Sequence, residues 1–146
     1  MNITVKKFNE LTTDELYEIL KSRAEVFLLE QNIVCQDLDD VDYECYHFFI
    51  KDKNRVTAYL RAYFFDEDKT TVKIGRVLTL DHGKGTGRIL MEKALDEIKN
   101  KIGCEKVFVN AQKQAEGFYM KCGFMSVSEE FMEEGIPHIR MEYKNV

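Results

Sequence analysis

The sequence lacks the features that mark membrane-spanning, secreted and metal-binding proteins. No run of about 18 apolar residues occurs, and the segment after Met1 has no apolar core of the signal-peptide type. The four cysteines form no Cys-x-x-Cys pair and have no metal-like spacing with the three histidines. We therefore expect a cytoplasmic protein with reduced thiols, no bound metal and no association with membranes.

The sequence also has little proline and no excess of positive charge. The 146 residues include one proline and no low-complexity segment, while 45% are hydrophobic, so a single domain over residues 1–146 is expected. Lys and Arg number 21 against 26 Asp and Glu, a net charge of -5. This balance disfavours a nucleic-acid partner, whose phosphates need basic residues, and suits an enzyme with cationic substrates. A homodimer is compatible with the sequence.

The segment from Ile74 to Ile102 contains the most informative pattern. Residues 74–80 have the apolar, β-branched character of a buried strand, three glycines at alternate positions follow, and apolar residues then recur at helical spacing. Glycines at a helix entrance allow several backbone N–H groups to converge on one anion, helped by the helix dipole. The pattern predicts a phosphate-binding loop, although an ordinary strand-to-helix turn also fits it.

The spacing of these glycines discriminates between phosphate-binding motifs. The Walker A motif fits no window, and the dinucleotide motif Gly-x-Gly-x-x-Gly fails because Arg88 or Leu90 stands where its last glycine is needed. The stretch His82-Gly83-Lys84-Gly85-Thr86-Gly87 resembles motif A of the GNAT superfamily of N-acetyltransferases, in which the loop holds the pyrophosphate of coenzyme A. His82 stands where that family usually has Gln or Arg.

Residue preferences and turn signals predict the order β-α-β-β-β-α-β-α-β-β. The first helix begins at a capping box of Thr12 and Glu15 and ends near Glu30. Its buried face is predicted to comprise Leu16, Ile19, Leu20, Ala24 and Phe27, with Glu15, Glu18 and Arg23 toward the edge of that face or outside it. Strands are predicted at residues 3–7, 46–50, 55–65, 71–80, 106–109, 124–128 and 138–143, with a turn over residues 133–137 before the last strand.

The C-terminal third adds a second resemblance. Residues 117–124 are similar to the second GNAT motif, and residues 25–31, 36–39, 75–77 and 135–138 are similar to the ElaA-like branch of that superfamily. The resemblance implies an α/β protein of the α+β type with the GNAT acyl-coenzyme A N-acyltransferase fold. Its mixed, mostly antiparallel sheet of six or seven strands would have flanking helices and would open where the strands near Thr79 and Phe108 diverge.

The resemblance further implies acetyl-coenzyme A as co-substrate. The phosphates would bind the N–H groups of Gly83 to Arg88, and the strand Val77–Leu80 would lie beside pantetheine and offer an N–H to the thioester carbonyl. The cofactor-binding residues implied are Leu78, Thr79, Leu80, His82, Gly83, Lys84, Gly85, Thr86, Gly87, Arg88, Asn110 and Tyr119.

Acetyl transfer to an amine also needs an acid and a base. The phenol of Tyr119, with an ordinary pKa near 10, can protonate a departing thiolate, whereas packing against Phe118 is the alternative. Glu30 is the first candidate base because it ends an apolar run that would bury it partly and raise its pKa. His138 is the second, and Asp37, Asp39 and His47 are further candidates, so the sequence does not single out one base.

The acidic segment Asp37–Glu44 is the expected acceptor side. Either it is a solvated loop, or its carboxylates attract a cationic small molecule or peptide amine. Asp37, Asp39, His47 and Arg76 are the predicted substrate residues, with pairing between Arg76 and one of these acids as the alternative. The predicted activity is transfer of acetyl to a primary amine by direct attack on the thioester. The competing hypotheses are a non-catalytic acyl-coenzyme A binding or regulatory module on the same fold and an interaction protein.

Overall fold

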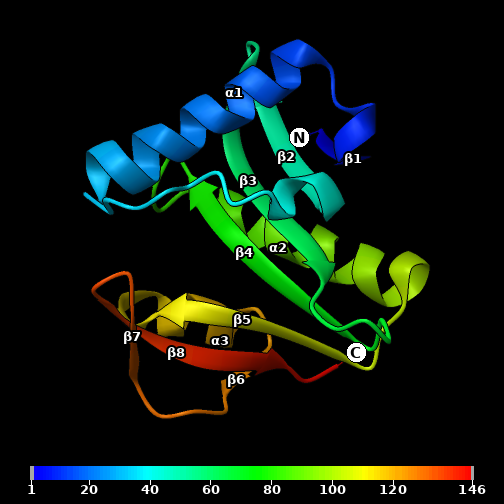
Figure 1. Cartoon of the computed structure of the whole chain (residues 1–146), viewed down its shortest axis with the longest axis vertical. Coiled ribbons are helices and arrows are strands. Elements are labelled where there is room, and N and C mark those ends of the chain that lie inside the picture. Colours follow the sequence, from blue (N-terminus) through cyan, green and yellow to red (C-terminus); the bar gives the residue numbers. More distant parts are fainter. Residues whose placement is uncertain (1, 146) are drawn as a thin grey trace.

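The computed structural model describes residues 2–145, which fold around one eight-stranded sheet (Figure 1). The strands lie in the order β1-β2-β3-β4-β5-β8-β6, and β7 pairs with β8. Every neighbouring pair is antiparallel except β4 and β5. The strands are β1 (Ile3–Lys7), β2 (Tyr46–Asp52), β3 (Arg55–Phe64), β4 (Thr71–Thr79), β5 (Lys106–Gln112), β6 (Phe124–Ser126), β7 (Phe131–Glu133) and β8 (Ile136–Tyr143).

The predicted fold class and its mixed, mostly antiparallel sheet are confirmed, with one strand more than expected. The turn before β8 is tighter than the predicted turn over residues 133–137. Glu134 and Gly135 both adopt positive φ, at 51° and 73°, and reverse the chain in two residues. Phe131–Glu133 therefore pairs with Ile136–His138 and forms the additional strand β7.

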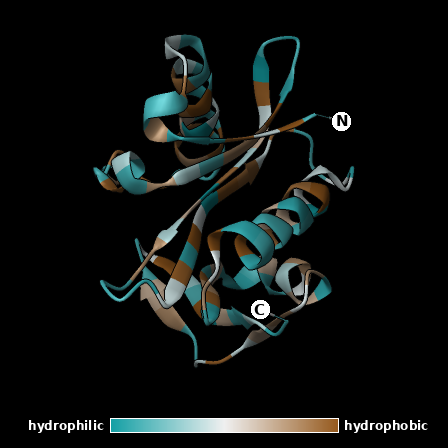
Figure 2. Cartoon of the chain, turned by 90° about the vertical axis from the view of Figure 1, so that its right-hand side faces the viewer, coloured by the Kyte–Doolittle hydropathy of each residue, from teal (hydrophilic) through white to brown (hydrophobic). Residues whose placement is uncertain are grey.

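Helices cover both faces of the sheet. The helices are α1 (Thr13–Arg23), α2 (Thr86–Glu97) and α3 (Glu116–Lys121), and π-helical turns extend α1 through Glu30 and α2 through Ile102. Side chains alternate along β2, so Phe48 and Ile50 pack with α2 and Phe49 packs with α1. Figure 2 shows hydrophobic residues concentrated along the central strands that these helices cover. None of the helices within residues 2–145 has the length and apolar character to cross a membrane.

The first helix begins as predicted but buries a different face. Thr12 and Glu15 form the expected capping box. Arg23 is only 1% exposed and Glu15 only 7%, whereas Ala24 is exposed. The prediction that Arg23 and Glu15 lie at the edge of the buried face or outside it is therefore wrong. Both are buried because each has a partner of opposite charge, Lys6 in the case of Glu15 and a pair of aspartates in the case of Arg23.

The sheet opens between β4 and β5, as expected. Parallel pairing extends from Thr71 to Ile74 on β4 and stops there, so the rest of β4 pairs with β3 alone. A β-bulge follows at once, because Arg76 and Val77 together stand opposite Leu60 of β3. Arg76 adopts a φ of +52°, which is unusual for a residue with a side chain. The bulge and the missing partner strand leave a gap between β4 and β5.

Candidate functional site

The glycine loop lies at the end of β4, where the gap is open. Gly83 and Gly85 have φ values of +79° and +78°, and a Cβ atom at either would meet no other atom within 4 Å. Gly85 is the N-cap of α2, and the first bond of the helix runs from the Ile89 N–H to the Gly85 carbonyl. The N–H groups of Thr86 to Arg88 therefore point out of the helix end without helical acceptors, the arrangement that binds anions.

Gly87 serves packing instead of a turn. A Cβ atom there would lie 3.1 Å from Cγ2 of Thr79 and 3.5 Å from the ring of Phe118. The first turn of α2 therefore lies directly against the end of β4. This contact brings the loop, the end of β4 and the start of α3 together, which are three of the four segments to which cofactor residues were assigned.

The predicted cofactor residues on β4 differ in how far their side chains are buried. The side chain of Leu78 is 4% exposed and packs with the α1 face of the sheet, so it presents only backbone to the gap. Thr79 and Leu80 are half-buried at the strand end. Asn110 lies across the gap on β5 and lines the cleft described below. The binding of coenzyme A by these residues stays a prediction.

His82 and Glu30 pair with each other at the mouth of the loop. His82 Nε2 lies 2.6 Å from Oε1 of Glu30, and the two side chains are 61% and 47% exposed. The partial burial expected for Glu30 is absent, and Glu30 does not line the cleft. Glu30 therefore loses the physical reason for its choice as base, and His82 has a protein partner where a phosphate was expected.

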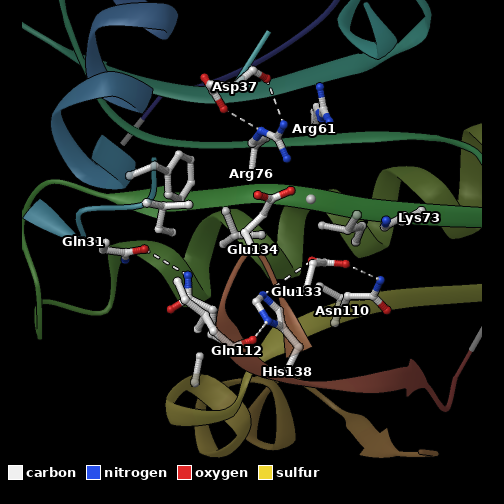
Figure 3. A pocket seen from close by; sticks show the side chains of 18 of the residues that line it. Gln31, Asp37, Arg61, Lys73, Arg76, Asn110, Gln112, Glu133, Glu134 and His138 are labelled. Carbon is white, nitrogen blue, oxygen red and sulfur yellow. Dashed lines mark hydrogen bonds and ion pairs between the residues drawn. The ribbon is translucent and has the colours of Figure 1, made fainter. Parts of the chain in front are cut away.

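A cleft continues from the gap toward β7 and β8 (Figure 3). It contains Tyr119 of α3, whose ring is 6% exposed and packs edge-on against Phe118 and Phe124. Burial raises the pKa of Tyr119, so the phenol keeps its proton at neutral pH but is a weaker acid than an exposed phenol. The other residues lining the cleft include Gln31, Asp37, Arg61, Tyr63, Lys73, Arg76, Asn110, Gln112, Glu133, Glu134 and His138.

His138 has the geometry of a base. It is 7% exposed, and its Nδ1 lies 2.7 Å from the carbonyl oxygen of Ile136. Because a carbonyl only accepts, Nδ1 carries the hydrogen and Nε2 is left to receive a proton. Nε2 lies 3.5 Å from Oε2 of Glu133, whose other oxygen accepts a hydrogen bond from Asn110 at 3.3 Å. A proton taken up at Nε2 would therefore face a carboxylate.

The acidic segment predicted to face the acceptor is bound to buried arginines. Arg61 holds both carboxylate oxygens of Asp39, at 2.8 and 2.6 Å, and also donates to Asp42 at 2.9 Å. Arg23 donates to the same oxygen of Asp42 at 2.7 Å. Burial alone would raise the pKa of Asp42, but the hydrogen bonds and charges of the two arginines lower it.

Arg76 and Asp37 complete this network at the cleft. Arg76 donates to Asp37 Oδ1 at 2.7 Å and to its carbonyl oxygen at 2.9 Å, while Arg23 binds Oδ2 at 3.0 Å. The alternative prediction that Arg76 pairs with an acid is confirmed. Asp37 lines the cleft, but three arginines already balance three aspartates, so the physical reason for expecting Asp37 and Asp39 to attract a cationic acceptor is weakened and their role stays a prediction. The Arg76–Asp37 pair also holds the strained bulge of β4 in place.

His47 does not reach the cleft either. It is 1% exposed, and its Nε2 lies 2.9 Å from the carbonyl oxygen of Asp42, so Nε2–H is the donor. Its Nδ1 then accepts from the hydroxyl of Tyr59 at 2.7 Å. Burial lowers the pKa of His47, which keeps the ring neutral. The assignment of His47 to the substrate is therefore wrong. The ring instead binds the backbone of the acidic segment at Asp42.

The ion pairs of Asp39 should make the protein sensitive to acid. Hydrogen bonds from Arg61 lower the pKa of Asp39 from 3.8 to about 2. A lowered pKa stabilises the fold above the unfolded value, and this contribution is lost as the pH falls from about 4 toward 2. We expect the melting temperature of the wild type to fall more steeply over this window than that of Asp39→Asn, which already lacks the contribution.

Asp40→Asn is the matched control for this measurement. Asp40 is exposed, has no ion pair within residues 2–145, and adopts a φ of 67°, which asparagine tolerates well. The melting temperature of Asp40→Asn should fall with decreasing pH as steeply as that of the wild type. If the melting temperatures of all three proteins fall equally steeply between about pH 4 and pH 2, the ion pair of Asp39 contributes nothing to stability.

Several cleft residues were missed by sequence reasoning. Gln112 of β5 donates a hydrogen bond to Gln31 at 2.9 Å, which joins the two sides of the cleft (Figure 3). Lys73 on β4 was also missed, as were the consecutive residues Glu133 and Glu134. Because side chains alternate along a strand, Lys73 and Gly75 lie on the same face of β4. A single lysine in an apolar strand does not indicate which edge of the sheet will open.

Comparisons with known proteins agree with this architecture. A family model described as acetyltransferase (GNAT) domain matches residues 44–145. A UPF0039 protein of Schizosaccharomyces pombe is 35% identical over 97% of this chain and 95% of its own length. The crystal structure of Escherichia coli ElaA superposes with a TM-score of 0.90 at 32% identity, over 98% of this chain and 99% of that one.

A more distant structure shares only the fold. The crystal structure of an aminoglycoside 6'-N-acetyltransferase complexed with coenzyme A has a TM-score of 0.75 at 12% identity. It covers 97% of this chain and 96% of that one.

Proposed function

The chain belongs to the GNAT acetyltransferase family, in the branch of the ElaA and UPF0039 proteins, and we propose that it is an acetyl-coenzyme A-dependent N-acetyltransferase acting on a primary amine. The observation that carries this proposal is the gap between β4 and β5, with the glycine loop and the start of α2 at its open end and Tyr119 inside the cleft.

The residues present fit coenzyme A. The free N–H groups at the start of α2 suit its phosphates, and the unpaired edge of β4 beyond Ile74 suits an extended pantetheine chain. A structure of the same fold was solved with coenzyme A, which supports the assignment. When bound, the cofactor supplies an acetyl thioester whose carbon accepts the amine.

The cleft offers a group for each proton in that reaction. An alkyl amine is almost wholly protonated at neutral pH, and His138 Nε2 can take up its proton with Glu133 beside it. The C–N bond forms as the C–S bond breaks, and the electron pair of the C–S bond remains on sulfur. Tyr119 would supply the proton that converts the thiolate to a thiol, and the second proton lost by the amine nitrogen after attack would restore the Tyr119 phenol, directly or through water. Backbone N–H groups at the bulge of β4 are the candidate donors to the carbonyl oxygen.

Burial of Tyr119 affects the energetics of this proton transfer. An apolar site that raises the pKa of a phenol also raises the pKa of a thiol placed beside it, because both anions lose the same solvation. The pKa difference between the phenol of Tyr119 and the thiol is therefore smaller in the cleft than the raised pKa of the phenol alone suggests.

The test is thiol release from acetyl-coenzyme A during incubation with a panel of primary amines, together with calorimetry of cofactor binding. We expect amine-dependent release well above the rate with buffer alone. The competing hypothesis is a non-catalytic acyl-coenzyme A binding module, which is favoured by the position of Glu30 outside the cleft. Tight cofactor binding without turnover of any amine would support the module.

A further inference from the structure

Most of the charged groups around the cleft cancel each other. Asp37 pairs with Arg76 and Arg23, and Arg61 is held by two aspartates. These pairs leave no net charge for a ligand. Apart from these pairs, the Lys, His and Glu side chains that line the cleft are Lys73 on β4, His138 on β8, and Glu133 and Glu134 at the turn between β7 and β8.

Lys73 is an ammonium group without a carboxylate partner. Within residues 2–145 no acid lies within ion-pair distance of its Nζ, which instead lies 5.8 and 5.9 Å from the ring centres of Phe65 and Phe108. Burial lowers the pKa of Lys73, the charge of Glu133 opposes this shift, and three nearby arginines lower the pKa further. A half-buried cation in such surroundings is stabilised by any anion that enters beside it.

Glu134 is the opposite case on the far side of the cleft. It belongs to the two-residue turn between β7 and β8, is exposed, and has no ion pair within the described part of the chain. Figure 3 shows the side chain of Lys73 on β4 to the right of Glu134, with Glu133 and His138 beneath. Lys73 and Glu134 both line the cavity but lie beyond ion-pair distance of each other.

We propose that the acceptor is an amine that also carries an acidic group, a carboxylate or a phosphate, so that Lys73 binds the acidic group while Glu133 and Glu134 receive the ammonium end beside His138. This inference rests on the proposed function. An acceptor of this type satisfies both unpaired charges at once, whereas a diamine would bring a second positive charge toward Lys73 and the neighbouring arginines.

The test compares four short primary amines that differ in the group at the far end. These are propylamine, 1,3-diaminopropane, β-alanine and O-phosphoethanolamine. We expect kcat/KM to be highest for β-alanine or O-phosphoethanolamine and lowest for 1,3-diaminopropane. The better of the two anionic amines tells whether Lys73 serves a carboxylate or a phosphate. A preference for the diamine would overturn the inference.

Variants of Lys73 connect this preference to the side chain. Lys73→Met should lower kcat/KM for the preferred anionic amine at least tenfold and remove the preference over propylamine, whereas Lys73→Arg should keep most of it. Lys99→Met is the matched control, because Lys99 is exposed on the π-helical end of α2 and lies outside the cleft. An anionic preference that survives in Lys73→Met would contradict the assignment.

Binding measurements separate this inference from the proposed activity. Calorimetry of β-alanine, O-phosphoethanolamine and 1,3-diaminopropane with the protein and coenzyme A requires no turnover. Tighter binding of an anionic amine without acetylation would overturn the proposed function and support the inference. Turnover of all four amines at similar rates, with similar affinities, would support acetyl transfer and overturn the inference.

Discussion

Gly85→Val is expected to abolish measurable binding of acetyl-coenzyme A while the protein stays folded. Gly85 has a φ of +78° and caps α2, and a β-branched residue is strongly disfavoured in that conformation. Forcing valine there costs roughly 1 to 3 kcal/mol, and the loop can relieve the strain by changing its path because the space around it is open. The N–H groups at the start of α2 would then no longer converge, and we expect a loss of affinity of at least 100-fold by calorimetry.

Gly103→Val provides a matched control. Gly103 also has a φ of +78°, and a Cβ atom there would meet no other atom within 4 Å, but it follows the far end of α2. Its ψ of 128°, against 1° for Gly85, is at least as unfavourable for valine, so the melting temperature should fall at least as much, with cofactor affinity unchanged. Equal affinity in wild type and Gly85→Val would mean that the loop does not hold the cofactor.

The fold could be predicted because its signals are local. The capping box at Thr12, the hairpin turn at Lys53–Asn54 with its two positive φ values, and the glycine loop each depend on residues within a few positions of one another. Helical spacing from Leu90 to Ile98 similarly indicated the face of α2 that packs on the sheet. The strand β7 was missed because three residues are too few to show a period.

The charge pattern of the site could not be predicted, because its pairs span long stretches of chain. Asp37 meets Arg76, 39 residues away, and Asp39 meets Arg61, 22 residues away. The sequence shows five acidic residues within Asp37–Glu44, which suggests a solvated or cation-binding loop. One signal was available: Arg23 lies four residues after Ile19 on the buried face of α1, and a buried arginine needs an acid.

Tyr119→Phe tests the acid on which acetyl transfer is proposed to depend. Phenylalanine keeps the edge-on packing with Phe118 and Phe124 and removes only the hydroxyl. If the phenol protonates the leaving sulfur, kcat should fall by about 10² to 10⁴, the range typical of general acid catalysis. Affinity for acetyl-coenzyme A should change little, because the contacts proposed for the phosphates and pantetheine lie on the glycine loop and β4. Steady-state kinetics with the best amine of the panel and calorimetry measure the two quantities separately.

Tyr63→Phe distinguishes a specific role of Tyr119 from a general loss of polarity in the cleft. Tyr63 on β3 lines the same cleft and is also partly buried, and burial raises its pKa as well. Its replacement should leave kcat within a few-fold of the wild type. If the two variants lose activity equally, hydration of the cleft explains the effect better than proton donation. If Tyr119→Phe retains nearly full kcat, the ring serves packing with Phe118, and the thiolate leaves without a proton from the protein.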